Sequence, residues 1–379
     1  MTHPYASFAG IGMPAYNFSD RLLASWEGTA SGEVYFNFMV FMVRSPGIPM
    51  PGHRDAPATT KLKYASSGDE MSPPDLSIVI VSWNVKDLLR QCLQSLLADL
   101  QTAPLTGEII VVDSASTDGS PQMTAREFPQ VTLIASDRNL GYAGGNNRGV
   151  QAARGRYLFL LNPDTVVKPG ALAAMTAYLD AHPQVAALGP QLLWPSGQIQ
   201  SSRRRFPTPG TLFWESTLLE QWFPHNRFRR YYHLADCPPD RPQQVDWVVG
   251  AAIMIRRTAW EQVGPIDEEY FMYFEETDWC RRAALAGWEV HYLPAAQVVH
   301  YEGKSSEQVF AARTLRFQRS KLRYTRKYFG PVWAAGLHGF LRLTFALQWA
   351  EETAKWLIGH RRPLRRQRMA AYGRLLREL

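Results

Sequence analysis

The chain has 379 residues, of which 46% are hydrophobic, and its 12 Trp, 16 Tyr and 18 Phe are enough to build a large globular core. Its cysteines, Cys92, Cys237 and Cys280, lack CxxC spacing, which argues against a disulfide framework or zinc site and fits a reducing compartment. The net charge of +7 is uneven: residues 301–379 carry 17 Lys/Arg against 5 Asp/Glu, whereas residues 1–300 carry 24 against 29, which weakens a nucleic-acid-binding role for the whole protein.

Residues 1–73 show no sustained hydrophobic period and are rich in Gly, Pro, Ser and Met, apart from one aromatic run at 34–40. We expect them to be a disordered or artefactual extension, with Met71 as the natural start. No basic segment followed by an apolar one begins the chain, so we expect no secretory signal.

Regular patterns begin after Pro74 and alternate between two types. Apolar runs predict strands over 76–82, 108–112, 131–135, 157–161, 250–256, 290–293 and 297–300. Amphipathic patterns predict helices over 86–99, 120–128, 145–153, 170–182 and 278–287, and residues 195–245 read as an excursion over the sheet. The alternation predicts an α/β fold with a mostly parallel sheet and right-handed crossovers.

The junction between Leu161 and Thr165 is the first candidate site. Five consecutive apolar residues, 157–161, predict a strand with both faces covered. Pro163 cannot donate to a strand ladder, so the strand should end there and present Asp164 at the carboxyl edge of the sheet. A carboxylate at that edge suits Mg²⁺ or Mn²⁺ shared with substrate phosphates, although an ordinary Pro-Asp turn explains the same letters.

Two further loops have nucleotide-binding character. Asp113 ends a strand before the polar turn 114–120, where a carboxylate can accept an imide N–H or simply support a helix cap. The glycine-rich segment 139–149 opens a helix whose N-terminus favours an anion, but it is neither GxGxxG nor a Walker loop.

The second half contains an acidic cluster bracketed by aromatic residues: Glu275, Glu276 and Asp278. A glutamate left free in an apolar pocket has a raised pKa, which suits a general base. The alternative is a capped helix with a solvated first turn, in which Arg281 and Arg282 neutralise Asp278.

Three other positions complete the candidates. His300 closes a short strand, where it is either structural or a metal ligand. Trp247, beside Asp246 and just before Gly250, is either a sugar-stacking wall or a core residue, with core packing slightly favoured.

The order of these segments resembles family 2 inverting glycosyltransferases, specifically the bacterial rhamnosyltransferase-like branch that builds cell-surface polysaccharides. The resemblance covers roughly residues 75–305 and rests on six segments in the right order: 77–84, 113–120, 139–147, 161–165, 250–252 and 273–278. Each segment is a weak signal alone.

The resemblance implies a GT-A (nucleotide-diphospho-sugar transferase) fold over residues 74–305, a nucleotide-diphospho-sugar donor and a Mg²⁺ or Mn²⁺ cofactor. It implies metal binding by Asp164 and His300, and acceptor binding by Asp246, Trp247 and Gly250. Glu276 would be the catalytic base, with Glu275 and Asp278 as substitutes, although the family usually has Asp at the position of Glu276. The implied donor-nucleotide residues are Ser82, Asn84, Asp113, Asn139, Gly141, Gly144, Asn147 and Asn162, the last standing where many members carry an Asp.

Residues 306–379 are helical in pattern, basic and aromatic. The largely apolar stretch 331–350 contains His338 and Arg342 and suits an interfacial helix better than a membrane span, and an arginine cluster follows at 361–368. We expect a peripheral protein on the cytoplasmic, inner face of the membrane, held by anionic lipid, with a lipid-linked or glycan acceptor. The alternative is a solvated helical subdomain.

The function that we expect is therefore inverting transfer of a sugar, first of all rhamnose. Transfer of galactofuranose or a hexose remains open, as does a non-catalytic nucleotide-sugar-binding protein at the membrane. Nucleic-acid binding through residues 306–379 would predict tight, salt-sensitive DNA binding, and we do not expect it.

Overall fold

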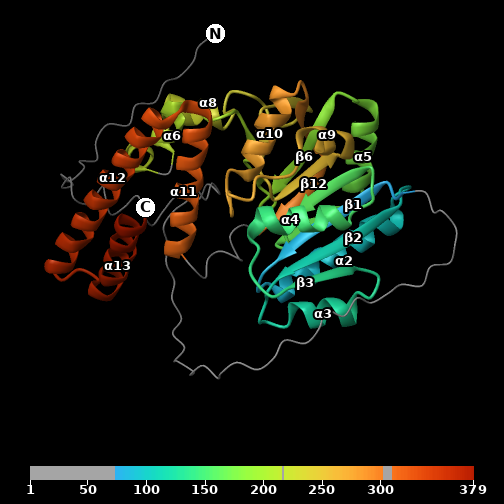
Figure 1. Cartoon of the computed structure of the whole chain (residues 1–379), viewed down its shortest axis with the longest axis horizontal. Helices are drawn as coiled ribbons and strands as arrows, with labels where there is room; N and C mark the ends of the chain where they lie inside the picture. Colours follow the sequence, from blue (N-terminus) through green and yellow to red (C-terminus); the bar gives the residue numbers. More distant parts are fainter. Residues whose placement is uncertain (1–72, 216, 302–309) are drawn as a thin grey trace, which may run out of the picture. The chain divides into compact units, whose positions relative to one another are not determined.

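A computed structural model describes residues 73–215, 217–301 and 310–379 (Figure 1). The expected extension, with its aromatic run and Met71, lies outside these residues except for Pro73, and so does the expected domain boundary at 305/306. Strands predicted from the apolar runs are present as β1 (Leu76–Ser82), β2 (Gly107–Ser114), β3 (Thr132–Ser136), β4 (Tyr157–Leu161), β11 (Ala252–Arg256) and β12 (Glu289–His300). The other strands are β5 (Thr165–Val167), β6 (Val185–Leu193), β7 (Ile199–Gln200), β8 (Arg203–Arg204), β9 (Gln243–Val245) and β10 (Trp247–Val248).

Within the described residues, ten of these strands form one mixed sheet. Its order is β3-β2-β1-β4-β11-β6-β12-β5, with β7 paired to β6 and β9 to β12. The pairs β1–β2, β2–β3, β1–β4 and β6–β12 are parallel, whereas β11 runs antiparallel to both β4 and β6. The carboxyl ends of β1, β2 and β4 therefore share one edge of the sheet, which is where ligands bind in open α/β folds.

Helices cover both faces of this sheet (Figure 1). On one face pack α2 (Lys86–Thr102), α3 (Ser120–Glu127) and α5 (Ala171–Ala181). On the other pack α4 (Gly141–Ala152), α9 (Arg257–Val263) and α10 (Glu275–Leu285). In β4, Phe159 and Leu161 enter the first core and Leu158 and Leu160 the second, which confirms that both faces of this strand are buried.

Four elements, β6, β12, α4 and α10, differ clearly from the sequence prediction. The strand β6 was missed because Gly189-Pro190 interrupts its nine buried residues, and both residue types are typical of turns. The two predicted late strands form the single strand β12, whose register shifts between Leu293 and Gln297 around Pro294. Helix α4 begins at Gly141 rather than residue 145, and α10 at Glu275 rather than residue 278, so both candidate segments lie in first helical turns.

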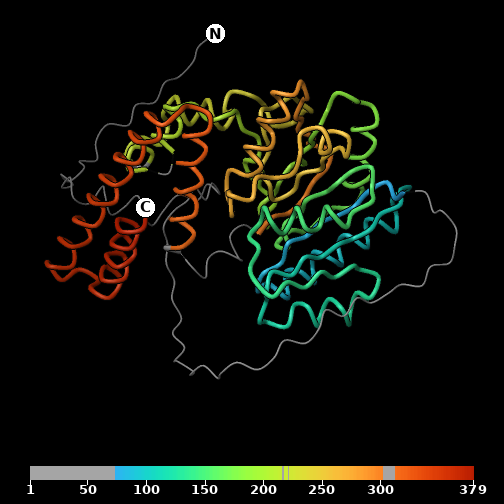
Figure 2. Tube along the Cα trace, viewed as in Figure 1, coloured from blue at the N-terminus to red at the C-terminus, as the bar shows by residue number. Residues whose placement is uncertain are grey.

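The chain after residue 309 is helical, as predicted, and forms α11 (Phe310–Phe329), α12 (Pro331–Leu357) and α13 (Arg362–Glu378). Figure 2 shows the trace of these helices in orange to red. They share a third apolar core with α6 (Pro209–Trp214), to which α12 contributes Leu337, Leu341 and Phe345. The excursion also contains α7 (Leu218–Trp222) and α8 (Arg227–Tyr232). No helix among the described residues is both long enough and apolar enough to span a membrane.

The fold class is therefore confirmed. The protein has an α/β body with a mostly parallel mixed sheet, followed by a helical C-terminal region.

Candidate active site

Asp164 and His300 meet at the end of β4. Strand β5 starts directly after Asp164 and pairs with the end of β12, so that His300 lies opposite Thr165. Their side chains are buried, and His300 Nε2 lies 3.6 Å from Asp164 Oδ1. The backbone N–H of Tyr301 donates to the Asp164 carbonyl oxygen at 2.9 Å and fixes the junction. The structure thus brings together two residues that are 136 positions apart in the sequence.

The donor set at this point suits a divalent cation. Asp164 Oδ1 is buried and has no hydrogen-bond partner among the described residues. The other ring nitrogen of His300, Nδ1, lies 3.0 Å from Gln200 Oε1, and because an amide oxygen accepts, this bond leaves Nε2 with a free lone pair. In the described part of the chain no group of three or more His, Cys, Asp or Glu side chains converges, so the described residues bring two such side chains, Asp164 and His300, to this point. An ion that takes its remaining ligands from water and substrate phosphates fits such a site.

Ser82, Asn84 and Asp113 lie together where β1 and β2 end. Ser82 is paired with Asp113 in the parallel register. Asn84 adopts a left-handed backbone conformation (φ 53°), and its Oδ1 accepts from the backbone N–H of Thr117 at 2.7 Å. One carboxylate oxygen of Asp113 accepts from the Ser116 N–H at 2.9 Å, while the other, Oδ1, is buried without a partner among the described residues. Burial raises the pKa of Asp113, so an added hydrogen-bond donor would stabilise its ionised form.

The glycine-rich segment forms the first turns of α4. Asn139 Oδ1 accepts from the Gly141 N–H at 2.9 Å, and Gly141 has φ 70°, where a Cβ would lie 2.5 Å from the Phe271 carbonyl oxygen. Only glycine fits this approach. Asn147, by contrast, has its amide occupied: it donates to the Ile266 carbonyl oxygen at 2.8 Å and to Glu268 at 2.9 Å. This bonding holds α4 to the segment before α10, and donor binding by Asn147 and Gly144 stays a prediction.

Glu275 is buried and Glu276 is half-buried at the first turn of α10. Tyr273 and Phe274 precede them with φ of 73° and 66°, left-handed conformations that are unusual for aromatic residues and mark a constrained site. Burial raises the pKa of Glu275 well above its ordinary value, and the neighbouring Glu276 charge raises it further. Burial also raises the pKa of Glu276. One oxygen of each carboxyl group, Oε2, is buried without a hydrogen-bond partner in the described part of the structure.

The backbone of Gly250 and Ala251 connects the two halves of the site. The Gly250 N–H donates to Glu276 Oε1 at 3.2 Å, and the Ala251 carbonyl oxygen accepts from the Asn162 N–H at 2.9 Å. Tyr142, in the first turn of α4, donates its hydroxyl proton to the Gly250 carbonyl oxygen at 2.5 Å. The acidic cluster, the glycine-rich segment and the Asn162–Asp164 junction therefore converge on one dipeptide.

Asp278 is different from its two neighbours. Its side chain is fully buried, and it accepts from Arg282 Nε at 3.0 Å and from the Tyr328 hydroxyl at 2.8 Å. Lys327 Nζ lies 2.7 Å away. Arg281, the other arginine expected to neutralise it, donates instead to the Tyr324 hydroxyl at 2.9 Å. These bonds suit a structural anchor for α10 rather than a substitute base.

Asp246 and Trp247 hold the excursion against the body. Asp246 Oδ2 accepts from the Phe206 N–H at 2.6 Å, and the Trp247 ring N–H donates to the Arg205 carbonyl oxygen at 3.0 Å. Trp247 is only 6% exposed and packs beside Tyr232 with ring centroids 6.0 Å apart. Trp247 is therefore a core residue rather than an open stacking wall. Of the expected acceptor residues, Gly250 donates a hydrogen bond to the acidic cluster, at Glu276.

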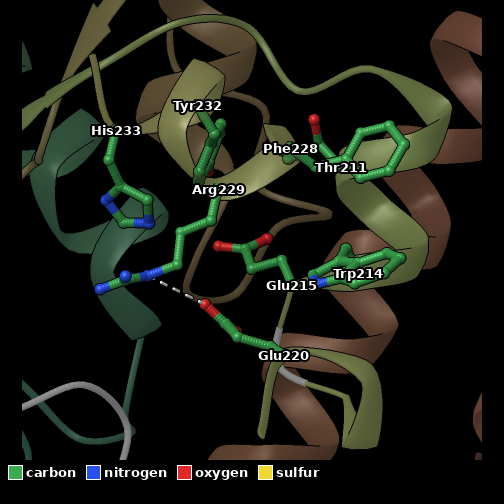
Figure 3. Close-up of a pocket in the computed structure, with 8 residues that line it drawn as sticks. All are labelled: Thr211, Trp214, Glu215, Glu220, Phe228, Arg229, Tyr232 and His233. Atoms are coloured by element: carbon green, nitrogen blue, oxygen red, sulfur yellow. Dashed lines mark ion pairs between the residues drawn. The ribbon is translucent and has the colours of Figure 1, made fainter. Parts of the chain in front are cut away.

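A small cavity lies in the excursion, lined by residues of α6, α7 and α8 and by Glu215 and His233 beside them (Figure 3). Its volume of about 10 Å³ has room for one water molecule and none for a sugar nucleotide. Glu215 lines it, and burial raises the pKa of this carboxyl to about 7. Lys321 is fully buried nearby, where its Nζ donates to the Leu212 carbonyl oxygen at 3.1 Å. This cavity is a buried polar site within the excursion.

Sequence reasoning missed two residues at the candidate site. Tyr142 lies inside the glycine-rich motif, and an aromatic residue among glycines was a signal that could have singled it out. Gln200, which orients His300, lies in the two-residue strand β7, and no sequence pattern marks it.

Comparisons with known proteins agree with these features. Residues 77–241 match the family model described as glycosyl transferase family 2. An N-acetylglucosaminyl-diphospho-decaprenol L-rhamnosyltransferase of Mycobacterium tuberculosis is 31% identical over 255 residues, which are 63% of this chain and 81% of that protein. The low-salt glycan biosynthesis hexosyltransferase Agl10 of Haloferax volcanii is 26% identical over 261 residues, 65% of this chain and 75% of its own.

Among solved structures, the mannosyltransferase PcManGT from Pyrobaculum calidifontis, in complex with GDP-Man and Mn²⁺, is similar with a TM-score of 0.47. It is 17% identical, and the match covers 83% of this chain and 89% of that chain.

Proposed function

Because the chain belongs to glycosyl transferase family 2, we propose that it transfers a sugar, first of all rhamnose, from a nucleotide-diphospho-sugar to a hydroxyl group of a lipid-linked or cell-surface glycan. We propose further that the transfer inverts the anomeric carbon and depends on a divalent metal ion. The observation that carries this proposal is the shared dipeptide: Gly250 bonds to Glu276, and Ala251 bonds to Asn162, two residues before Asp164.

The donor side of the proposal uses the carboxyl edge of the sheet. The free Asp113 Oδ1, beside Ser82 and Asn84, would accept an N–H of the nucleotide base. Asp164 and His300 would hold Mg²⁺ or Mn²⁺, which supplies positive charge against the leaving diphosphate. The Gln200 bond supports this role because it keeps the His300 Nε2 lone pair directed away from the amide.

The acceptor side uses the first turn of α10. Glu276 Oε1 is held by the Gly250 N–H, and its Oε2 has no partner among the described residues, so this oxygen would take the proton from the acceptor hydroxyl. The deprotonated hydroxyl attacks the anomeric carbon from the face opposite the nucleotide in one displacement. Glu275, whose pKa is raised further by its neighbour, would stay protonated and leave Glu276 as the base.

The proposed identity of the donor sugar is based on similar proteins rather than on the geometry of the site. The similarity to an L-rhamnosyltransferase that acts on N-acetylglucosaminyl-diphospho-decaprenol supports rhamnose as donor sugar and a lipid-diphosphate-linked acceptor. The similarity to a hexosyltransferase supports the second candidate, transfer of a hexose or galactofuranose. A lipid-linked acceptor would place the protein on the cytoplasmic face of the membrane.

A donor screen tests the proposal. The protein is incubated with dTDP-, UDP- and GDP-sugars, Mg²⁺ or Mn²⁺ and an N-acetylglucosaminyl-diphospho-prenol acceptor, and the released nucleoside diphosphate is measured. We expect dTDP-rhamnose to give acceptor-dependent release that chelation of the metal abolishes. Donor binding without release from any sugar would instead support a non-catalytic nucleotide-sugar-binding protein.

A further inference from the structure

One stripe of the outward face of α12 carries no polar side chain along the whole helix, although the exposed Arg342 and Glu351 lie beside it. The residues of this stripe recur every three or four positions, and all of them are exposed. At 1.5 Å per residue the 27-residue helix is about 40 Å long. We call this row of residues the outer stripe, and it consists of Val332, Gly336, Gly339, Leu343, Leu347, Ala350, Ala354 and Leu357.

The opposite face of α12 already supplies the third core. Leu337 and Leu341 are fully buried there, whereas Leu343 and Leu347 on the outer stripe are 57% and 49% exposed. A soluble surface helix normally places polar residues opposite its buried face. A continuous apolar surface of this kind marks an interaction site rather than a solvated face.

The outer stripe ends at a basic groove. Leu357 and Ile358, at the end of α12, are 64% and 81% exposed. Beside them lies a shallow groove of about 520 Å³, to whose lining Trp356, Arg362 and Arg366 contribute. Arg362 Nε donates to the Trp356 carbonyl oxygen at 3.2 Å, which fixes its guanidinium near the indole ring. The exposed apolar side chains of Leu357 and Ile358 therefore lie next to the guanidinium groups of Arg362 and Arg366.

We propose that the outer stripe and this groove form a docking surface for an anionic lipid bilayer. In this arrangement α12 lies in the plane of the membrane interface, its apolar residues enter the acyl boundary, and Arg362 and Arg366 bind lipid phosphates. The proposal goes beyond sugar transfer and does not depend on it, because it rests only on the exposed face and charge of the C-terminal helices.

Charge favours a bilayer over a second copy of the chain. Residues 310–379 carry 16 Lys/Arg against 3 Asp/Glu, so pairing two such surfaces would bring like charges together. An anionic lipid surface instead attracts each of these basic residues. Trp333 and Trp349, which flank the outer stripe and are 49% and 39% exposed, suit the boundary between water and lipid.

The test is co-sedimentation of the full-length protein with vesicles of phosphatidylglycerol mixed with phosphatidylethanolamine, and with phosphatidylcholine vesicles. The stripe variant is Leu343→Glu with Leu347→Glu, and the groove variant is Arg362→Gln with Arg366→Gln. Leu285→Glu is the matched control, because Leu285 is 77% exposed on α10, outside the stripe. Thermal melting of each variant checks the fold, which substitutions at exposed positions should leave intact.

We expect the wild type to bind the anionic vesicles and to be released by high salt. The stripe variant should lose about tenfold or more of the affinity, and the groove variant about tenfold, since each loses two contacts. The control should bind like the wild type. Equal sedimentation of stripe variant and wild type would overturn the proposal. So would a wild-type dimer, seen by light scattering, that ignores vesicles and dissociates in the stripe variant.

Discussion

Two adjacent glutamates with different surroundings are the central feature at the scale of single residues. Burial and the Glu276 charge both raise the pKa of Glu275 and so favour its protonated form. Glu276 accepts the Gly250 N–H, which favours its ionised form. When two carboxyl groups lie this close, one ionises at the expense of the other, and the hydrogen bond decides which.

We predict different results for the two amide substitutions. Glu276→Gln removes the proposed base and should lower kcat by about 10²–10⁴-fold while donor binding is retained. Glu275→Gln imitates the protonated carboxyl and should lower kcat by about tenfold or less. Steady-state release of nucleoside diphosphate measures both, with Glu261→Gln, at an exposed position on α9, as the control. A fully active Glu276→Gln protein would contradict the assignment.

The pH profile of the same reaction is a second prediction. Because the pKa of Glu276 is raised by burial, the base loses its charge at a higher pH than an ordinary glutamate does. The acidic limb of the kcat profile should therefore lie above pH 4.5, the ordinary glutamate value. A limb at or below that value would show that a more exposed carboxylate is the base.

Glu215 gives a prediction about stability. Its pKa is about 7 in the folded protein and ordinarily 4.5, so between these values the folded state holds a proton that the unfolded chain has lost. Stability from this group is therefore present below pH 4.5 and lost as pH rises to 7, by about 3 kcal/mol at most. Glu215→Gln should melt above the wild type at pH 8, and the difference should shrink at pH 5. An equal difference at both values would contradict the raised pKa.

At the scale of elements, α11 anchors the helix that carries the acidic cluster. Lys327 and Tyr328 of α11 reach Asp278, which is fully buried in α10. A buried carboxylate without its partners is costly, so the C-terminal helices stabilise the proposed catalytic turn as well as their own core. Removing the chain beyond residue 305 would expose this site, and membrane binding is therefore better tested by point substitutions.

Lys327→Met should lower the stability by about 1–3 kcal/mol, because Asp278 stays buried with Arg282 as its remaining cationic partner and with the hydroxyl groups of Tyr328 and Tyr270. The control is Lys355→Met, which breaks an exposed pair with Glu351 and should cost about 0.5 kcal/mol or less. Thermal melting monitored by circular dichroism distinguishes them, and equal melting temperatures would show that Asp278 does not need the charge of Lys327.

Local sequence patterns predicted much of the fold. The apolar runs of β1 and β4 were predicted with their observed bounds, because a strand covered on both faces leaves a continuous signal in the sequence. The strand β6 was not predicted, because Gly189-Pro190 resembles a turn. Its pairing with the neighbouring strands β11 and β12 makes this segment a strand. The start of α10 was also misplaced, because its cap is the left-handed Phe274 rather than a polar residue.

The sequence also predicted part of the candidate site, namely its main residues but not their contacts. Asp164, Asp113 and Glu276 stand at element ends, which motifs mark. The hydrogen-bond partners of Asn147 and Trp247 lie in segments far away in the chain, and no local sequence pattern identifies them. For the same reason the pairing of His300 with Gln200, and the link through Tyr142, were visible only in the structure.

For the whole molecule, the separation of charge is the feature that a functional account must explain. The net charge of residues 1–300 is −5 and that of residues 301–379 is +12. Nucleic-acid binding would explain the positive end but leaves the uncharged outer stripe of α12 without a role. A transferase that works on a lipid-linked acceptor at an anionic membrane gives a role to both. Salt-sensitive DNA binding stronger than binding to anionic vesicles would reverse that preference.

The central claim is that Asp164 binds the metal ion and Glu276 acts as the base. Calorimetric titration of nucleoside diphosphate with Mn²⁺ tests it most directly. The wild type and Glu276→Gln should bind with similar affinity, and chelation of the metal should weaken both. Asp164→Ala should lose the metal-dependent part of the binding, because His300 alone cannot hold the ion. Metal-dependent binding by Asp164→Ala equal to that of the wild type would contradict the account.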